Sequence, residues 1–261
     1  MFQYAAARSL ALDKSAGLLL HVTNWKKRPG HPDHDRFALD LFGISAPRFR
    51  LAAYKMGRIL RLNNRLGCIA PIRHVVDDTN IYNPKVHELR QTCWLRGSWV
   101  SHKYFEHNGA TIRRELDLGQ HLQASNLYGQ VTPRTVSVHV RRGDYFWHPG
   151  EHRVLSGDYI RRAMAEFPDH QFLIFSDDIE WCRETFKDQD CLFSEGNSAI
   201  ADMALMSSCP NNIIANSTFS WWAAWLNPNP DKRVIAPAKW FGADVADREK
   251  QEFIPSGWTR L

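Results

Sequence analysis

The sequence lacks the features that mark several specialised classes of protein. Its five cysteines are odd in number and form no C-x-x-C pair, which argues against a disulfide framework and against a cysteine-based zinc site. No apolar run approaches the roughly 20 residues that span a bilayer, and no signal peptide opens the chain. Internal repeats and low-complexity tracts are also absent. We therefore expect a cytoplasmic globular protein, and peripheral contact with the inner face of a membrane stays open.

Apolar and aromatic residues, in contrast, are plentiful. The chain has 261 residues, of which 44% are apolar, with 10 Trp, 7 Tyr and 14 Phe. Such a composition supports a substantial core in one large domain or two smaller ones. The formal net charge of +5 suits a small anionic ligand, an acidic membrane surface or nucleic acid, and it does not choose among them.

Residues 135–145, TVSVHVRRGDY, are the stretch around which the rest of the chain can be arranged. The first six alternate β-branched and small polar side chains, which is typical of a strand. Arg141 and Arg142 follow where this strand ends, at the edge where open α/β sheets bind ligands. Guanidinium groups bind phosphate oxygens through two parallel hydrogen bonds and stay charged, and Gly143 lets the backbone turn or approach a ligand closely. The stretch predicts a diphosphate clamp, formed by the two arginines, that works without a metal ion.

Two arginines after a strand are also common as a plain surface feature, so the neighbouring residues matter. The three valines of the strand share one face, which leaves Ser137, His139 and Arg141 on the other. A polar face that leads to the strand tip is unusual in a fully buried α/β strand. This pattern favours the binding-site interpretation.

Downstream of this strand, helix and strand patterns alternate, which argues for a parallel sheet built from βαβ units. The pattern predicts a helix with Tyr159, Ile160, Ala163, Met164 and Phe167 on its apolar face, a strand at 171–175, a helix around 181–186, a helix at 199–209, a strand at 211–215 and a helix that ends at Asn227 and Pro228.

We place a domain boundary in the polar stretch that contains Pro133, which gives an N-terminal domain of residues 1–130 and a C-terminal domain of residues 131–261. The N-terminal domain is expected to open with a helix that stops at Gly17, followed by a strand that extends to Val22.

Three segments of the N-terminal domain suit binding but also have a plain structural interpretation. Residues 26–36 hold His31 and His34 among aspartates, either as a metal site or as an ordinary solvated loop. Residues 48–66 have the pattern of an arginine-rich helix, which suits anionic lipid or polysaccharide or is simply a charged outer face. The aromatic residues of 95–105 suit stacking on a sugar or packing in the core.

A further candidate site lies where the strand at 211–215 meets the next helix. Ser217 and Thr218 stand at this junction, so a helix amino terminus with hydroxyl groups faces the carboxyl edge of the sheet. Free backbone N–H groups and the helix dipole favour anions there. Alternatively, Ser217 or Ser220 merely caps the helix. The three tryptophans that follow are expected in the core.

Five segments together resemble the bacterial α-1,2-fucosyltransferases of glycosyltransferase family 11: MFQYAAARSLA, SVHVRRGDY, FLIFSDDIEWC, DMALMSSCPNNIIANSTFSWWAAWLNPNP and VIAPAKWF. The resemblance runs from residue 1 to about residue 241 in the family's order, with little signal in residues 26–92. It implies an α/β protein of the GT-B type, in which two Rossmann-like domains face a cleft and the C-terminal one holds most of GDP-fucose. It also implies inverting transfer of L-fucose to the 2-hydroxyl of a galactose in an oligosaccharide or polysaccharide, without a metal ion or other cofactor.

Carried over by position, the resemblance assigns roles to single residues. Arg141 and Arg142 would hold the diphosphate and offset the charge that develops on the departing GDP. His139 would lie near the nucleoside and the first phosphate. Asp202 would accept hydrogen bonds from N1–H and the 2-amino group of guanine. The residues expected to line the pocket or to support the arginines are Gly143, Asp144, Ser217, Thr218, Phe219 and Ser220.

The sequence also departs from the family's pattern. MFQYA usually follows a strand and a glycine-rich G-G-L-G-N-Q turn, and here it starts at Met1, so the first strand of the N-terminal domain is expected to be missing. The alternative to an active transferase is therefore a truncated, inactive protein that binds GDP or a glycan. A nucleic-acid-binding protein is a third hypothesis, supported only by the net charge and the arginine-rich helix, and it predicts salt-sensitive binding. Asp188 and Asp190 have the spacing of a metal-binding D-x-D, but their charged loop argues against that role.

Overall fold

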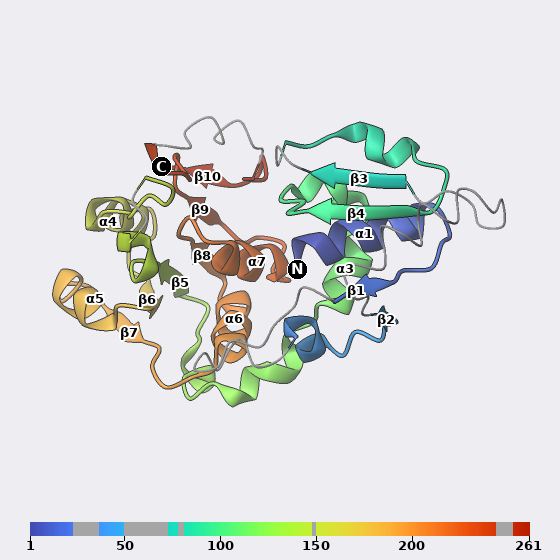
Figure 1. The fold of residues 1–261 in the computed structure, drawn as a ribbon. Coiled ribbons are helices and arrows are strands. Elements are labelled where there is room, and N and C mark those ends of the chain that lie inside the picture. The colour runs from blue at the N-terminus through green and yellow to red at the C-terminus, as the bar shows by residue number, and fades with distance from the viewer. Residues whose placement is uncertain (23–36, 50–72, 78–80, 148–149, 244–252) are drawn as a thin grey trace. The chain divides into compact units, whose positions relative to one another are not determined.

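The strand predicted at 135–140 is present as β5 (Thr135–Val140), inside a six-stranded sheet (Figure 1). The strand order is β7-β6-β5-β8-β9-β10, and all neighbouring pairs are parallel. Numbered along the chain, this order is 3-2-1-4-5-6, that of the Rossmann domains. The other strands are β6 (Gln171–Ser176), β7 (Cys191–Phe193), β8 (Asn211–Ile213), β9 (Val234–Ala236) and β10 (Thr259–Arg260).

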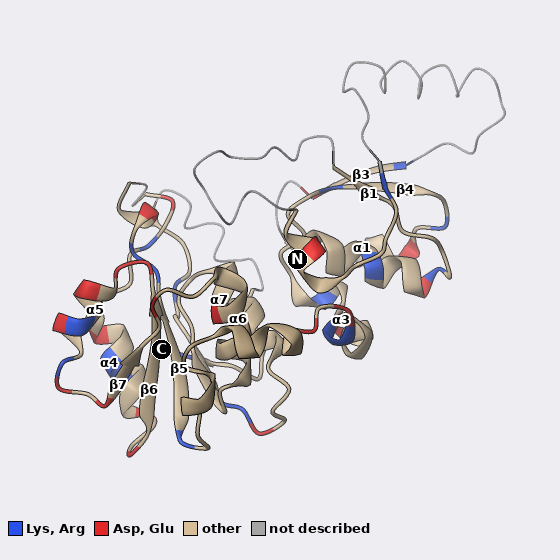
Figure 2. Ribbon diagram, turned by 90° about the horizontal axis from the view of Figure 1, so that it is seen from below, with Lys and Arg blue, Asp and Glu red and all other residues tan. Residues whose placement is uncertain are grey.

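Helices cover both faces of this sheet. On one face, α4 (Gly157–Ala165) and α5 (Ile179–Thr185) pack on the valines of β5 and on Phe172 and Ile174 of β6. On the other face lie α6 (Ala199–Ser208) and α7 (Thr218–Leu226), which reach the sheet through hydrogen bonds such as that from Asn212 to the Met206 carbonyl. Figure 2 shows β5 and β6 without charged residues, as expected of strands buried between helix layers.

The apolar residues predicted for the core of this sheet domain are there. The five side chains of the helical face at 159–167 are at most 4% exposed, and Trp221, Trp222 and Trp225 of α7 are at most 5% exposed. The α7 helix ends at Leu226 with Asn227 as its C-cap, as the Asn-Pro pair predicts. The α/β prediction with a parallel sheet is confirmed.

The computed structural model describes residues 1–22, 37–49, 73–77, 81–147, 150–243 and 253–261. These fall into two compact units: unit 1 holds the described residues up to Leu116 together with Phe253, and unit 2 holds those from Asp117 onward apart from Phe253. Residues 117–130 group with unit 2, where Asn126 hydrogen bonds with Asn197. Compactness does not define domains that fold separately, so the boundary at residue 130 stays a prediction.

Unit 1 is built around two parallel strand pairs. β1 (Leu20–His21) pairs with β2 (Arg48–Phe49), and β3 (Arg73–Asp77) pairs with β4 (Cys93–Gly97). Its α-helices in the described residues are α1 (Phe2–Asp13) and α3 (Gly109–Glu115). The 3₁₀ helices are η2 (Ala38–Phe42), η3 (Pro84–Glu88), η4 (His102–Tyr104) and η5 (Glu106–Asn108) in unit 1, and η6 (Gly119–Ala124), η7 (Tyr128–Gln130) and η8 (Asp144–Trp147) in unit 2.

One expectation for unit 1 is corrected, and one open alternative is decided. The first helix ends at Asp13, four residues before Gly17, and Ser15 takes the left-handed conformation with φ of 50°. The backbone N–H groups of Lys14 and Ser15 already bond to carbonyls of the last turn, so no glycine is needed. The rings of Trp99, Tyr104 and Phe105 are at most 3% exposed, so these residues pack in the core and are not a sugar-stacking surface.

Other expectations are outside the described residues or only partly addressed by them. The histidine-bearing loop at 26–36 lies outside the described residues, as do Arg58, Arg61 and Arg65 of the arginine-rich segment. The described cysteines, Cys93, Cys182, Cys191 and Cys209, are free thiols. Among the described helices, none has the length and apolar character needed to cross a bilayer.

Candidate functional site

The carboxyl ends of β5 and β8 form the point where the strand order of the sheet reverses. β5 and β8 are adjacent, and their connections leave the sheet toward opposite sides, which opens a crevice for ligands in folds of this topology. Two contacts join β5 and the segment after it to the segment that follows β8. Nδ1 of His139 lies 2.9 Å from the hydroxyl oxygen of Ser220, and the Tyr145 hydroxyl donates to the Asn216 carbonyl at 2.9 Å.

Arg141 leaves β5 with its guanidinium bonded to carboxylates. Nε and Nη2 reach Oδ1 of Asp144 at 3.0 and 2.9 Å, and Nη1 reaches Oδ2 of Asp177 at 3.1 Å. Partial burial opposes protonation of this group, but the two carboxylates outweigh it and raise the pKa of Arg141. The side chain is 35% exposed, so the charge stays accessible at the sheet edge.

Arg142 is more deeply buried than Arg141, with 14% of its side chain exposed. Nε donates to Oδ2 of Asp178 at 3.0 Å, and the guanidinium carbon lies 3.7 Å from the centre of the Trp181 ring. The Phe146 ring lies 4.8 Å from the same atom. Among the described residues, the two terminal nitrogens of Arg142 have no hydrogen-bond partner, so aromatic rings orient a guanidinium whose outer edge can still donate.

Asp177 and Asp178 are the site residues that the sequence interpretation did not single out. They follow β6, the neighbour of β5, and hold the two arginines from that side. Oδ1 of Asp177 also accepts from the backbone N–H of Arg142 at 2.9 Å. The sequence shows two carboxylates directly after the strand that became β6, but the pairing of β6 with β5 is needed to place them beside the arginines.

Gly143 lies against the Asp177 carboxylate. A Cβ atom at this position would come within 2.7 Å of Oδ2 of Asp177, which is closer than real Cβ contacts. The glycine therefore lets the chain pass the aspartate at close range. Asp144 holds Arg141 directly, as described above.

His139 is 6% exposed and faces α7. Burial, helped by the nearby charge of Arg141, lowers the pKa of His139 to about 3, so the imidazole is neutral at physiological pH. Its ring centre lies 5.5 Å from that of Phe219. The structure thus brings His139, Phe219 and Ser220 together.

The amino terminus of α7 is capped by Ser217, whose hydroxyl accepts from the Phe219 N–H at 3.3 Å. The capping interpretation is confirmed, and anion binding by this helix end stays a prediction. Thr218 is exposed and Ser217 and Phe219 are half-buried, so this end of the helix is accessible from the crevice side of β8.

The sequence of this chain is similar to those of known proteins. The family described as Glycosyl transferase family 11 matches residues 88–261. The chain belongs to glycosyltransferase family 11.

Two relatives align with the whole length of this chain. It is 34% identical to the O-antigen biosynthesis glycosyltransferase WbnK of Escherichia coli and 30% identical to an alpha-1,2-colitosyltransferase of the same species. Each alignment covers all of this chain, with 96% of the first relative and 94% of the second. Human galactoside alpha-(1,2)-fucosyltransferase 1 is 37% identical over 51% of this chain and 42% of that protein. The resemblance seen in the sequence is confirmed at the level of a family 11 glycosyltransferase.

Asp202 of this family 11 chain lies in a helix that does not directly follow β5 or β8, the strands at the reversal point. It stands in the first turn of α6, which follows β7, the second strand from β5. Its Oδ1 accepts from the Ser194 hydroxyl at 2.7 Å, and that hydroxyl in turn accepts from Asn197 at 2.8 Å. The carboxylate is thus oriented by neighbours, and its role toward guanine stays a prediction.

Asp188 of the D-x-D forms a two-pronged ion pair with Arg161, at 2.8 and 2.9 Å. These hydrogen bonds hold the pKa of Asp188 well below its usual range. Asp190 accepts from Gln171 at 3.3 Å. Both carboxylates therefore have structural partners within unit 2.

Unit 1 of the family 11 chain contains a polar cavity that the sequence did not reveal, of about 380 Å³. Within it, the Tyr4 hydroxyl donates to Glu115 at 2.7 Å, and Arg8 binds the same carboxylate at 2.7 to 3.0 Å. Arg114 lines the cavity and is exposed. The other lining residues are Leu18 and the segment from Phe42 to Pro47.

Proposed function

We propose that this family 11 glycosyltransferase transfers L-fucose from GDP-fucose, with inversion, to the 2-hydroxyl of a galactose that ends an oligosaccharide or polysaccharide. One observation carries the proposal: two arginines held by carboxylates and aromatic rings stand at the strand-order reversal of a Rossmann sheet, beside a capped helix amino terminus. This is the position at which such sheets bind nucleotides.

The arginines suit the charge that develops in the reaction. As the bond from the anomeric carbon to the phosphate breaks, negative charge grows on the leaving diphosphate and positive charge grows on the sugar. Fixed donors that are already oriented stabilise such a state without having to reorganise. Arg142 has its terminal nitrogens available for this, and its stacking on Trp181 fixes the plane of the guanidinium.

Arg141 binds the diphosphate in competition with its own carboxylate partners. Asp144 is 60% exposed and is the partner that a phosphate displaces most easily, whereas Asp177 is 25% exposed and also holds the Arg142 backbone. In this proposal Asp144 keeps Arg141 oriented in the free enzyme and yields one edge of it to the ligand.

The nucleoside is bound on the side of α7 in this proposal. His139 is neutral there, so it takes part as a hydrogen-bonding group and not as a cation. The hydroxyls of Ser217, Thr218 and Ser220 and the ring of Phe219 line the phosphate and nucleoside pocket, and Asp202 meets guanine.

The acceptor is bound by unit 1 in this proposal, at the polar cavity lined by Arg8, Arg114 and Glu115. Its volume of about 380 Å³ lies within the range of small-molecule sites. Arginine, carboxylate and tyrosine groups are hydrogen-bonding partners that suit sugar hydroxyls.

A second candidate donor is GDP-colitose, because a relative named for colitose transfer is 30% identical over the whole chain. An assay of GDP release, with a terminal β-galactoside as acceptor and each donor in turn, tests both candidates. We expect release with GDP-fucose that requires the acceptor and yields an α-1,2 linkage, with no stimulation by added divalent ions. Faster release with GDP-colitose would replace the donor in the proposal. GDP binding without release from either donor would favour an inactive protein that only binds the nucleotide.

A further inference from the structure

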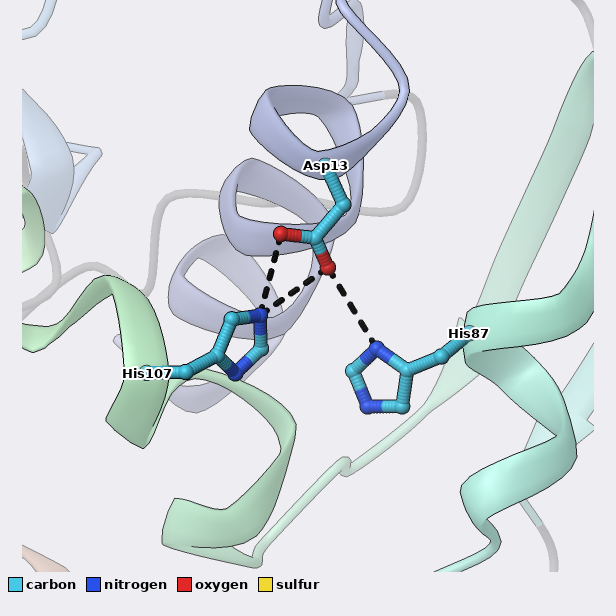
Figure 3. Close-up of side chains that lie close together, drawn as sticks. All are labelled: Asp13, His87 and His107. Carbon is cyan, nitrogen blue, oxygen red and sulfur yellow. Dashed lines mark hydrogen bonds and ion pairs between the residues drawn. The ribbon is translucent and has the colours of Figure 1, made fainter.

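Three potential metal ligands converge in unit 1, well apart from the residues of the proposed nucleotide site in sequence (Figure 3). Asp13 is the last residue of α1, His87 lies in η3 and His107 lies in η5. Nε2 of His107 lies 3.0 and 2.9 Å from the two carboxylate oxygens of Asp13, and Nδ1 of His87 lies 3.4 Å from Oδ2. One ligand atom from each residue lies within 4.8 Å of the other two.

The two separations from Asp13 are close to those that a tetrahedral zinc ion imposes. Zinc bonds of about 2.0–2.1 Å hold neighbouring ligand atoms about 3.3 Å apart. The two distances to Asp13 already bracket this value, so only the two imidazoles need to move relative to each other. Two imidazoles and one carboxylate are also a ligand set that zinc uses when water occupies the fourth position.

The surroundings support the carboxylate and leave room for an ion to enter. Asn108 donates to Oδ1 of Asp13 at 2.8 Å, which fixes the carboxylate from outside the three ligands. The hydroxyl oxygen of the buried Ser9 lies 3.3 Å from Nε2 of His107, the nitrogen that would bind the ion, so the ion replaces this contact. The side chain of His107 is 47% exposed, so the open side of the group faces solvent.

We propose that Asp13, His87 and His107 bind one Zn²⁺, with water as the fourth ligand, and that the ion ties the end of α1 to η3 and η5. In the metal-free state a neutral imidazole donates N–H to the carboxylate. Binding requires the other tautomer, in which that proton sits on the other ring nitrogen, and this frees the nitrogen lone pair for the metal. The site lies outside the groups assigned to glycosyl transfer, so it stabilises unit 1 and carries no step of the reaction.

The test is titration of chelator-treated, tag-free protein with Zn²⁺ alone, followed by calorimetry and by thermal unfolding. We expect one site in the wild type, a Tm that rises with Zn²⁺, and at least about a tenfold loss of affinity in His87→Gln and in His107→Gln. His74→Gln is the matched control, because His74 is an exposed histidine of unit 1 that stacks on Trp94 outside the cluster. It should bind Zn²⁺ as the wild type does.

A second measurement keeps the proposal testable if a cluster variant does not fold. Co²⁺ added to the wild-type protein should give the visible absorption bands of a tetrahedral ion, and Zn²⁺ should remove them. Absence of Zn²⁺ binding to the wild type, equal binding by the double variant His87→Gln/His107→Gln, or a purely octahedral Co²⁺ spectrum would overturn the proposal. Each of these results would leave a hydrogen-bonded cluster only.

Discussion

Nδ1 of His139 lies 2.9 Å from the hydroxyl oxygen of Ser220, a contact that joins β5 to the first turn of α7. His139 lies in β5, and Ser220 lies in α7, the helix that follows β8. β5 and β8 are neighbours at the point where the strand order reverses. Because the imidazole is buried, this contact fixes the distance between the arginine-bearing segment and the helix amino terminus.

The buried imidazole makes stability depend on pH. The pKa of His139 is about 3 in the folded protein and about 6.5 when unfolded, so between these values the unfolded chain binds a proton that the folded chain does not. The contribution of His139 to the free energy of unfolding is therefore largest above pH 6.5. Between pH 6.5 and pH 3 it falls by about 1.4 kcal/mol for each unit by which the pH drops. Urea unfolding at pH 7 and pH 5 should show a loss of about 2 kcal/mol from this group. His139→Gln should remove that part of the loss, and an unchanged acid slope would contradict a neutral, buried imidazole.

The close approach of Gly143 to Asp177 should be needed for activity. Gly143→Ala places a Cβ within 2.7 Å of a carboxylate oxygen that also faces Arg141, so the aspartate or the arginine must shift. We expect transfer to fall by about tenfold or more, an effect of about 1.4 kcal/mol on the barrier. Gly129→Ala is the control, since nothing lies within 4 Å of its Cβ position. Equal rates in the two variants would show that the packing at Gly143 does not matter.

Asp202 should set the preference for guanine. Loss of the negative charge in Asp202→Asn weakens acceptance from N1–H and the 2-amino group, so GDP affinity should fall while ADP affinity stays the same. Calorimetry with the two nucleotides measures the ratio, which we expect to fall by about tenfold, or about 1.4 kcal/mol. Asp188→Asn is the matched control, because Asp188 is occupied by Arg161. An unchanged GDP to ADP ratio in Asp202→Asn would assign guanine recognition elsewhere.

The variant Arg114→Ala should affect binding of the acceptor and leave binding of the donor nucleotide unchanged. It lines the unit 1 cavity, is exposed and bonds only weakly, at 3.4 Å, to Thr111, so Arg114→Ala should fold normally. We expect KM for the galactoside to rise several-fold and the Kd for GDP to stay constant. A change in GDP affinity with no change in acceptor KM would remove the cavity as the acceptor site.

The sequence predicts the nucleotide-binding half of the fold because its signals are local. Strand β5 has the bounds that its alternating pattern indicates, and the apolar face of α4 and the tryptophans of α7 are buried as expected. The right-handed connections of βαβ units then limit the topologies that this sheet can adopt. Because the predicted strand ends at Val140, these local signals were enough to place Arg141 at the carboxyl edge of the sheet.

Contacts between distant segments were beyond this kind of inference. The partners of the arginines, Asp177 and Asp178, follow a different strand, and their register with β5 is set by the sheet. Ser137, expected on a polar face that signals a site, accepts a buried hydrogen bond from Asn212 at 2.7 Å and so has a structural role. In unit 1, Asp13 and His107 are 94 positions apart, and no periodic pattern links them.

Binding of GDP to the wild type and to Arg142→Ala, measured by calorimetry, tests the central claim most directly. The account predicts that GDP binds the wild type without added metal and that Arg142→Ala, while still folded, loses about 100-fold in affinity, or about 2.7 kcal/mol. Arg161→Ala, which removes the surface partner of Asp188, should bind GDP as the wild type does. Absence of GDP binding to the wild type, or equal affinity in Arg142→Ala, would contradict a diphosphate clamp at the end of β5.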